Sequence, residues 1–316
     1  MHVAHDPARV PLAEGTRRAV RVATASVLVA SGLGGIKLLA AILTSSIALA
    51  ASFVDSLMDI FASSVNLLAV RIGGRPADDD HRYGHGKAES LAGMFQGAVV
   101  GFSGVYLVVE SVKRLVEGSA TAHETVGLAV MAVSVLASAW ITWLLRRTAK
   151  ATGSVALAAD SLHYASDVLM NAGVFAALGV VALTGWTWVD PVVGLGVAFL
   201  VLKSSWSVIR ASVDELMDRD LGADVETEVR AAVARGVPEA RGLRALRTRR
   251  AGRRRFVDLT VALDRRLPFA DAHRLSERAR AAVREAVPDA EVTVHADPDP
   301  LLPDDHPGGD GAGAAS

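Results

Sequence analysis

Long apolar runs separated by short polar segments fill the first two-thirds of the chain. Six of these runs approach the ~20 residues that a helix needs to cross a bilayer. A bilayer core offers no water to the backbone, so an apolar segment that crosses it has to satisfy its own hydrogen bonds as a helix. The pattern therefore predicts six membrane-spanning helices, at about residues 19–42, 47–72, 89–112, 124–145, 154–184 and 187–209.

The pattern changes after Arg210 to charged segments with helical and strand-like periods. Their order, αββαβ, predicts a small α+β domain with its helices on one face of a three-stranded sheet. The fold class expected for the whole chain is a membrane bundle of six helices followed by this domain. The helices are expected at about 223–236 and 268–287, and the strands at about 243–250, 254–264 and 290–297.

Composition divides the chain into four parts. The first is polar and contains two prolines, the second holds the six apolar runs, and the third carries the charged pattern. The last is rich in Pro, Gly, Asp and Ala, which is typical of disordered segments. We therefore predict a mobile cytoplasmic arm, a membrane domain, a cytoplasmic α+β domain and a disordered tail, at residues 1–16, 17–210, 211–297 and 298–316.

The overall composition is that of a polytopic membrane protein. Hydrophobic residues make up 51% of the chain and the mean hydropathy is +0.33, which is too apolar for an ordinary soluble protein. The formal net charge of −1 gives no indication of nucleic-acid binding. Because the chain contains no cysteine, disulfides, thiolate metal sites and cysteine nucleophiles are excluded. Any metal must be held by His, Asp, Glu or backbone oxygen.

Lysine and arginine gather on one side of the predicted membrane domain. The loops on the other side, such as LTSS and LTGWTW, are nearly free of positive charge, with Lys113 and Arg114 as the exception. By the positive-inside rule, both termini are expected in the cytoplasm and the protein in the inner cell membrane. The basic residues that precede the first span, or lie in the loops after the second and fourth spans, are Arg9, Arg17, Arg18, Arg21, Arg71, Arg75, Arg82, Lys87, Arg146, Arg147 and Lys150.

A repeated stretch places ionisable residues inside two of the apolar runs. Residues 48–59 read ALAASFVDSLMD and residues 156–167 read ALAADSLHYASD. Each copy carries two potential metal ligands four residues apart, a spacing that puts both on one face of a helix. Ionisable groups at membrane depth are expensive and indicate function. Together the copies offer a four-ligand set that suits a divalent transition metal such as Zn²⁺: Asp55, Asp59, His163 and Asp167.

Two further polar features lie near this repeat. The loop DDDHRYGHGKAE offers Asp78, His81 and His85, with the histidines four residues apart. A histidine pair in a polar loop is either an incidental metal binder or a functional site, and its residues alone leave both readings open. Asp160 lies three residues before His163. It either relays protons or faces a neighbouring helix.

Three stretches together resemble the cation diffusion facilitator family, in particular its bacterial zinc and iron efflux branch. They are ASFVDSLMDIFASSVN, PADDDHRYGHGKAESLAG and DSLHYASDVLMN. The resemblance covers residues from about 15 to 297. It implies a homodimeric, proton-coupled exporter of divalent cations, with six spans and a cytoplasmic domain that resembles a metallochaperone.

The resemblance also implies roles for individual residues. The four residues of the repeat would form the transport site, in a pattern similar to that of zinc, iron and cadmium carriers. The manganese branch usually has a carboxylate in place of His163, and imidazole is the softer ligand, so Zn²⁺ is favoured over Mn²⁺. Fe²⁺, Co²⁺ and Cd²⁺ stay open. The loop cluster would be a second metal site, and Lys87 would form an ion pair with Asp218 near the dimer seam, or serve only as a cytoplasmic positive charge.

The chain departs from the family in the cytoplasmic domain. The matching positions His273, His295 and Asp297 are present, but Arg244 and Thr260 stand where bacterial zinc exporters have histidines. An arginine cannot ligate a cation and stays charged. We therefore expect no binuclear site, and at most one weakly held metal on the three remaining ligands. The alternative is that His273 is an ordinary surface residue of its helix.

The sequence thus predicts a proton-coupled exporter that works by alternating access. Its site must be deprotonated to bind metal, and His163, with a reference pKa near ~6.5, is the group best placed to change charge. We expect no enzymatic activity and no cofactor besides the transported metal. The expected partners are a second copy of the chain, divalent metal ions, protons and the lipid bilayer, without nucleic acid. The alternatives are a metal-binding sensor or scaffold through which nothing crosses, and a metal-dependent hydrolase, which a site with four protein ligands disfavours.

Overall fold

The computed structural model describes residues 12–44, 47–117, 125–186 and 188–299. The chain divides into two compact units. One comprises the described part of Asp6–Arg219 together with Arg250–Arg254, and the other comprises Asp220–Arg249 and the described part of Arg255–Ser316. The predicted N-terminal arm, as far as residue 11, and the predicted tail from residue 300 lie outside the described residues.

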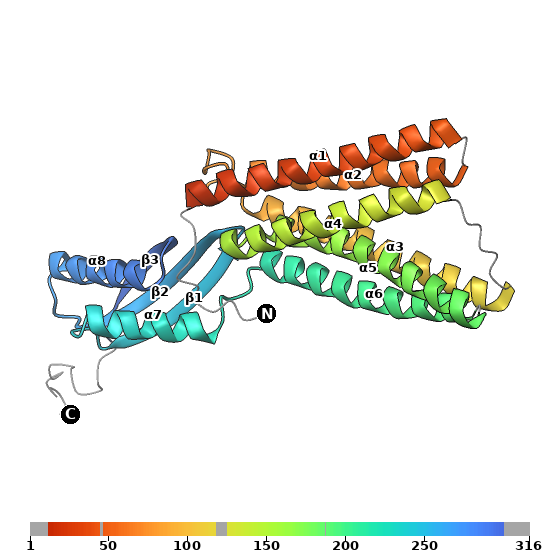
Figure 1. Ribbon diagram of the computed structural model, residues 1–316. Helices are drawn as coiled ribbons and strands as arrows, with labels where there is room; N and C mark the ends of the chain where they lie inside the picture. Colours follow the sequence, from red (N-terminus) through yellow and green to blue (C-terminus); the bar gives the residue numbers. More distant parts are fainter. Residues whose placement is uncertain (1–11, 45–46, 118–124, 187, 300–316) are drawn as a thin grey trace, which may run out of the picture. The chain divides into compact units, whose positions relative to one another are not determined.

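The first unit is a bundle of long helices (Figure 1). Within the described residues, four of them are long and apolar enough to cross a membrane, namely α1, α2, α3 and α6. Each predicted span lies on one helix, to within about two residues, and most helices continue beyond the apolar run into charged residues. The helices are α1 (Leu12–Thr44), α2 (Ile47–Gly73), α3 (Lys87–Glu117), α4 (Thr125–Thr152), α5 (Val155–Thr184) and α6 (Val189–Leu216).

Many large apolar side chains lie on the outside of this bundle, and many small or polar ones lie inside it. Leu43, Phe102 and Leu183 are exposed, the last of them to 89%, whereas Ser26 and Ser63 are fully buried. Exposed apolar area of this extent marks a surface that another apolar phase covers. In a membrane helix bundle that phase is lipid, and small residues mediate the contacts between helices.

Glycines on α3 permit one of the closest helix contacts. A Cβ atom added at any of four glycines would lie only 2.7 to 2.9 Å from side-chain atoms of α6. The two backbones therefore approach more closely than larger residues would allow, and the Ser205 hydroxyl donates a hydrogen bond across the contact to the Gly97 carbonyl at 2.7 Å. The four glycines are Gly93, Gly97, Gly101 and Gly104.

The second unit contains two helices and a three-stranded sheet of order β1-β2-β3, in which β2 and β3 are parallel. Alternate residues of β2, from Val257 to Leu263, share one apolar core with both helices. Because side chains alternate across a strand, the residues between them face the other side of the sheet. The elements are α7 (Ala223–Gly236), β1 (Gly242–Ala251), β2 (Arg254–Leu263), α8 (Phe269–Ala286) and β3 (Ala290–Pro298).

The predicted fold class is confirmed. The chain is a membrane bundle of six helices followed by an αββαβ domain, and each predicted strand of that domain lies on an observed one.

Candidate metal centres

The repeat brings three of its four candidate metal ligands together inside the helix bundle. Asp59 comes from α2, and His163 and Asp167 come from α5, with one ligand atom of each within 4.8 Å of the others. His163 Nε2 lies 2.9 Å from Asp59 Oδ1 and 3.9 Å from Asp167 Oδ2. The histidine is buried and both carboxylates are partly buried. Residues four apart share a helix face, so each helix presents its ligands to the other.

Asp55 stands one helical turn before Asp59 on α2 but is not part of this three-residue cluster. Its side chain is exposed, whereas Asp59 is partly buried. The structure therefore presents a cluster of three ligands with a fourth carboxylate nearby.

The contact between His163 and Asp59 joins the two atoms that a metal would bind. A carboxylate that is ionised can only accept, so the hydrogen bond requires a proton on Nε2 of His163. A metal ligated by Nε2 needs the same lone pair free of that proton. In this arrangement a proton and a metal compete for one nitrogen atom.

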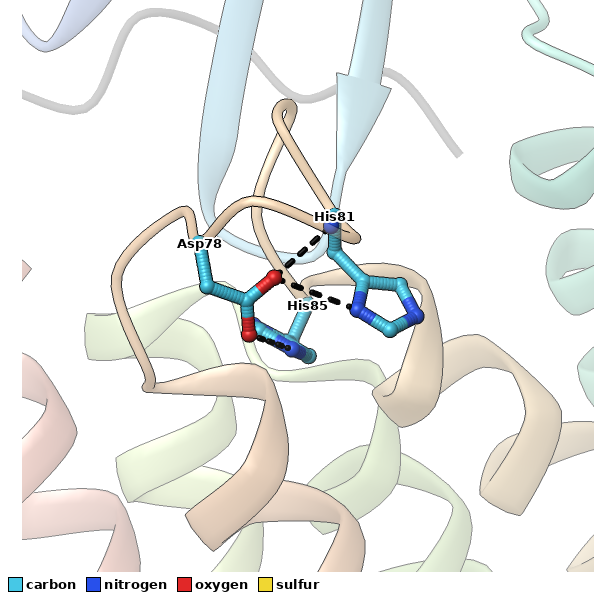
Figure 2. A group of neighbouring side chains, drawn as sticks. All are labelled: Asp78, His81 and His85. Carbon is cyan, nitrogen blue, oxygen red and sulfur yellow. Dashed lines mark hydrogen bonds and ion pairs between the residues drawn. The ribbon is translucent and has the colours of Figure 1, made fainter.

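A second cluster lies in the loop between α2 and α3, where the carboxylate of Asp78 contacts both histidines (Figure 2). Asp78 Oδ1 lies 3.3 Å from His81 Nδ1, and Asp78 Oδ2 lies 3.1 Å from His85 Nε2. The backbone N–H of His81 also donates to Asp78 at 2.7 Å, which holds the pKa of this carboxyl below its ordinary value. The carboxylate is therefore ionised at neutral pH and available as a ligand.

A backbone carbonyl orients His85 within this loop. His85 Nδ1 lies 3.2 Å from the carbonyl oxygen of Pro76. Because a carbonyl can only accept, Nδ1 carries the proton and the lone pair of Nε2 points toward Asp78. Ligating histidines in metal sites are commonly fixed in this way by a partner on the other ring nitrogen. The geometry of His85 is thus suited to metal binding.

The predicted ion pair between Lys87 and Asp218 is present in the structure. Lys87 Nζ lies 3.0 Å from Asp218 Oδ1 and also donates to the carbonyl of Leu216 at 3.2 Å. Asp218 has a positive φ of 57°, a conformation that Asp tolerates better than most residues. The pair thus joins the start of α3 to the residues that follow α6.

The cytoplasmic ligands are divided between different places in their domain. His295 Nε2 lies 2.9 Å from Asp297 Oδ1 on β3, and Thr260 pairs with His295 in the parallel register of β2 and β3. Arg244 from β1 places its guanidinium 3.7 Å from Asp297. His273 lies on α8 and forms no three-ligand cluster with His295 and Asp297 among the described residues. A permanent positive charge therefore stands beside the two remaining strand ligands.

A buried cluster of polar residues surrounds Asp160. Asp160 is fully buried and accepts from Ser26 Oγ at 2.6 Å, from Ser63 Oγ at 3.2 Å and from Asn66 Nδ2 at 3.2 Å. Asp160 thus faces neighbouring helices α1 and α2. Ser63 lies one turn after Asp59, and Asp160 lies about one turn before His163. The cluster therefore ties α2 to α5 one turn away from the metal ligands.

Sequence reasoning missed Lys37. This lysine interrupts the apolar run of α1, and its Nζ donates to Ser56 Oγ at 2.8 Å on α2. The available signal was a single lysine in the stretch SGLGGIKLLAAIL, since an ionisable residue inside a span is a candidate functional residue.

Comparisons with known proteins place both parts of the chain in one family. A family model described as the cation efflux transmembrane domain matches residues 23–217, and one described as the cytoplasmic domain of a cation efflux protein matches residues 221–299. The cation-efflux pump FieF of Shewanella oneidensis is 37% identical over 87% of this chain and 92% of its own length. FieF of Pectobacterium atrosepticum is 38% identical over 84% and 88%.

A solved MamM CTD structure in a nickel form is also similar, at 28% identity over 25% of this chain and 100% of that chain. Its TM-score is 0.24, so it carries no structural argument.

Proposed function

The chain belongs to the cation efflux family, also called the cation diffusion facilitators, and from this premise we propose that it exports a divalent transition-metal cation in exchange for protons. The observation that carries the proposal is the cluster of Asp59, His163 and Asp167 inside a membrane bundle. Ionisable residues at membrane depth that face one another line an ion path in many transporters. Cation-efflux pumps that are similar in sequence over most of this chain support the same proposal.

The ligand set favours Zn²⁺ as the cargo. One imidazole and two or three carboxylates offer nitrogen and oxygen donors, and Zn²⁺ accepts such a set as a tetrahedron. Mn²⁺ prefers oxygen ligands alone, so the imidazole of His163 favours binding of Zn²⁺ over binding of Mn²⁺. Fe²⁺, Co²⁺ and Cd²⁺ accept imidazole as well and are the next candidates.

Competition between proton and metal at His163 supplies the coupling. The proton that joins Nε2 to Asp59 has to leave before the nitrogen can ligate a metal. Metal from the cytoplasm binds the deprotonated site, and the bundle then opens toward the outside. Protons that arrive there restore the hydrogen bond and release the metal.

The remaining features fit roles around this cycle. Positive loops place both termini, and with them the cytoplasmic domain, on the side from which metal enters. The loop cluster of Asp78, His81 and His85 lies on that side and binds metal before or during transport. The family model for the cytoplasmic domain is named for a dimer, and we propose that two chains assemble. Because the positive charge of Arg244 lies beside Asp297, the cytoplasmic domain binds metal weakly or not at all.

Metal flux in proteoliposomes tests the proposal. The purified protein is reconstituted with a zinc-sensitive dye inside the vesicles, and Zn²⁺, Fe²⁺, Cd²⁺ and Mn²⁺ are added outside with and without a pH gradient. We expect uptake that requires the protein and rises with the gradient, with Zn²⁺ ahead of Mn²⁺. Uptake at the same rate with and without the pH gradient would contradict proton coupling but would still support metal transport.

Two other functions have less support. A sensor or scaffold would bind Zn²⁺ with no flux in the same vesicles. A metal-dependent hydrolase needs an open coordination position for water and a base beside it. With Asp55 as the fourth ligand, the site has no open position for water, so we propose that the protein is not an enzyme.

A further inference from the structure

We propose that Lys37 is a fixed counter-charge of the transmembrane metal site, one that weakens metal binding and so permits release. The inference rests on the proposed function, because it concerns the same site. It assigns a role in transport to a residue that donates no metal ligand.

The position of the ammonium group is the first support. Lys37 Nζ donates to Ser56 Oγ at 2.8 Å and lies 3.5 Å from the carbonyl of Ser52. Ser56 is buried and stands between Asp55 and Asp59 in the sequence of α2. A lysine near the end of a span commonly extends its amine to the membrane surface. Here the amine is instead bound to the helix that carries half of the site.

The helix register is the second support. Ser56 precedes Asp59 by three residues on α2, so the two side chains share one face of that helix, and the ammonium bound at Ser56 stands on the face that carries Asp59. Asp59 in turn contacts His163 of α5 at 2.9 Å. Inside a membrane bundle such charges are weakly screened, and one charge changes the affinity of a neighbouring ion site substantially.

The net charge of the site shows the effect of the lysine. The three carboxylates of Asp55, Asp59 and Asp167 carry three negative charges. When His163 is neutral, the positive charge of Lys37 reduces the net charge of the group to −2. A divalent cation then makes the group neutral. Asp160 is left out of this count because its carboxylate belongs to the separate cluster with Ser26 and Ser63. Without Lys37 the ligands would hold a dication with one unbalanced negative charge.

The expected consequence is tighter binding and slower turnover. A metal held by a site with one extra negative charge leaves less readily, whichever side the site faces. A transporter has to bind its cargo and also release it, so the lysine favours release. Its loss is expected to lower the Zn²⁺ dissociation constant and the maximal transport rate together.

The test measures Zn²⁺ binding and uptake with full-length protein that lacks the loop ligands through Asp78→Ala, His81→Ala and His85→Ala. In this background, Lys37→Met removes the charge and keeps an unbranched side chain, and Lys37→Arg keeps the charge. Lys203→Met is the matched control, because it removes the same charge from an exposed position on α6. Binding is measured by isothermal titration calorimetry in detergent, and uptake is measured in proteoliposomes.

We expect Lys37→Met to lower the dissociation constant for Zn²⁺ about tenfold and to lower the maximal uptake rate. Lys37→Arg and Lys203→Met should leave both quantities unchanged. An affinity of Lys37→Met that equals that of Lys203→Met, or is weaker, overturns the inference.

Two further variants separate the possible failures. Asp59→Ala in the same background should abolish the binding that calorimetry detects. If it does not, the proposed site is wrong, whatever Lys37 does. If Asp59→Ala abolishes binding and Lys37→Met leaves the affinity unchanged, only the role of Lys37 fails. Should Lys37→Met not fold, Ser56→Ala decides, because it frees the ammonium: tighter Zn²⁺ binding supports the inference, and unchanged binding overturns it.

Discussion

Replacement of Asp160 by alanine is expected to destabilise the helix bundle and weaken metal binding together. The carboxylate accepts three hydrogen bonds, from Ser26 on α1 and from Ser63 and Asn66 on α2. Alanine removes all three acceptor contacts, while Ser26 and Ser63 keep the contact between their hydroxyls and Asn66 keeps its contact with Gln96. The change falls one helical turn from His163, between the two helices that carry the ligands.

The structure sets the magnitude of this effect. A hydrogen bond between membrane helices contributes on average ~0.6 kcal/mol and at most ~1.7 kcal/mol, so three of them contribute about 2 to 5 kcal/mol. Asparagine at the same position keeps the shape and one acceptor oxygen. The hydroxyl of Ser26 can turn to accept from the new amide. Asp160→Asn should therefore lose only a small part of the stability that Asp160→Ala loses.

Thermal stability in detergent provides the assay. The fraction of protein that stays monodisperse after heating is measured by fluorescence-detected size exclusion, and Zn²⁺ affinity is measured on the same samples. We expect the transition of Asp160→Ala to fall by at least about 5 °C, with a weaker Zn²⁺ affinity. Ser63→Ala should show a smaller loss. Its control is Ser103→Ala, because Ser103 bonds only to a carbonyl of its own helix.

Two results would refute this reasoning. If Asp160→Ala had the same transition temperature as the wild type, the hydrogen bonds would not hold the helices together. If it melted early but bound Zn²⁺ with unchanged affinity, the cluster would stabilise the bundle without positioning the ligands.

Three further outcomes follow from single residues. His163→Asp should raise Mn²⁺ uptake relative to Zn²⁺ uptake in proteoliposomes, because it replaces an imidazole by an oxygen ligand; an unchanged ratio would contradict this. Leu259→Ala should lower the stability of the cytoplasmic domain by about 2 to 5 kcal/mol, since the side chain is buried in the core. Limited proteolysis on heating would detect that loss, and Phe269→Ala, at 88% exposure, is the control. Asp264 accepts from the backbone N–H of Arg266, which lowers the pKa of its carboxyl, so its contribution is present at neutral pH and lost as the pH falls through that lowered pKa. Asp264→Asn should therefore lower the melting temperature at neutral pH, and the difference should vanish in acid.

The fold of the membrane domain could be predicted from the sequence, because an apolar segment that crosses a bilayer has to form a helix. The same reasoning brought Asp59, His163 and Asp167 together, since ligands four residues apart on two helices have to face inward to avoid lipid. It did not show that Asp55 would stand outside the three-residue cluster. Whether a residue points into a site or along its rim depends on the rotation of its helix, which packing decides.

The polar contacts around the site could not be predicted from the sequence in the same way. The partners of Asp160 come from helices that lie 94 to 134 residues away in the chain. No local pattern pairs them. Lys37 could have extended toward the membrane surface, and only the packing of α1 on α2 brings its amine to Ser56. The division of the cytoplasmic ligands likewise depends on which face of the sheet each element covers, and His273 lies on the helix α8.

Zinc uptake by two matched variants tests the central claim most directly. Asp59→Ala and Asp78→Ala each remove one carboxylate from a metal cluster, the first inside the bundle and the second in the loop. We expect Asp59→Ala to reduce Zn²⁺ uptake into proteoliposomes to the level of protein-free vesicles, and Asp78→Ala to keep measurable, gradient-driven uptake. Uptake by Asp59→Ala at the rate of the wild type would contradict the claim.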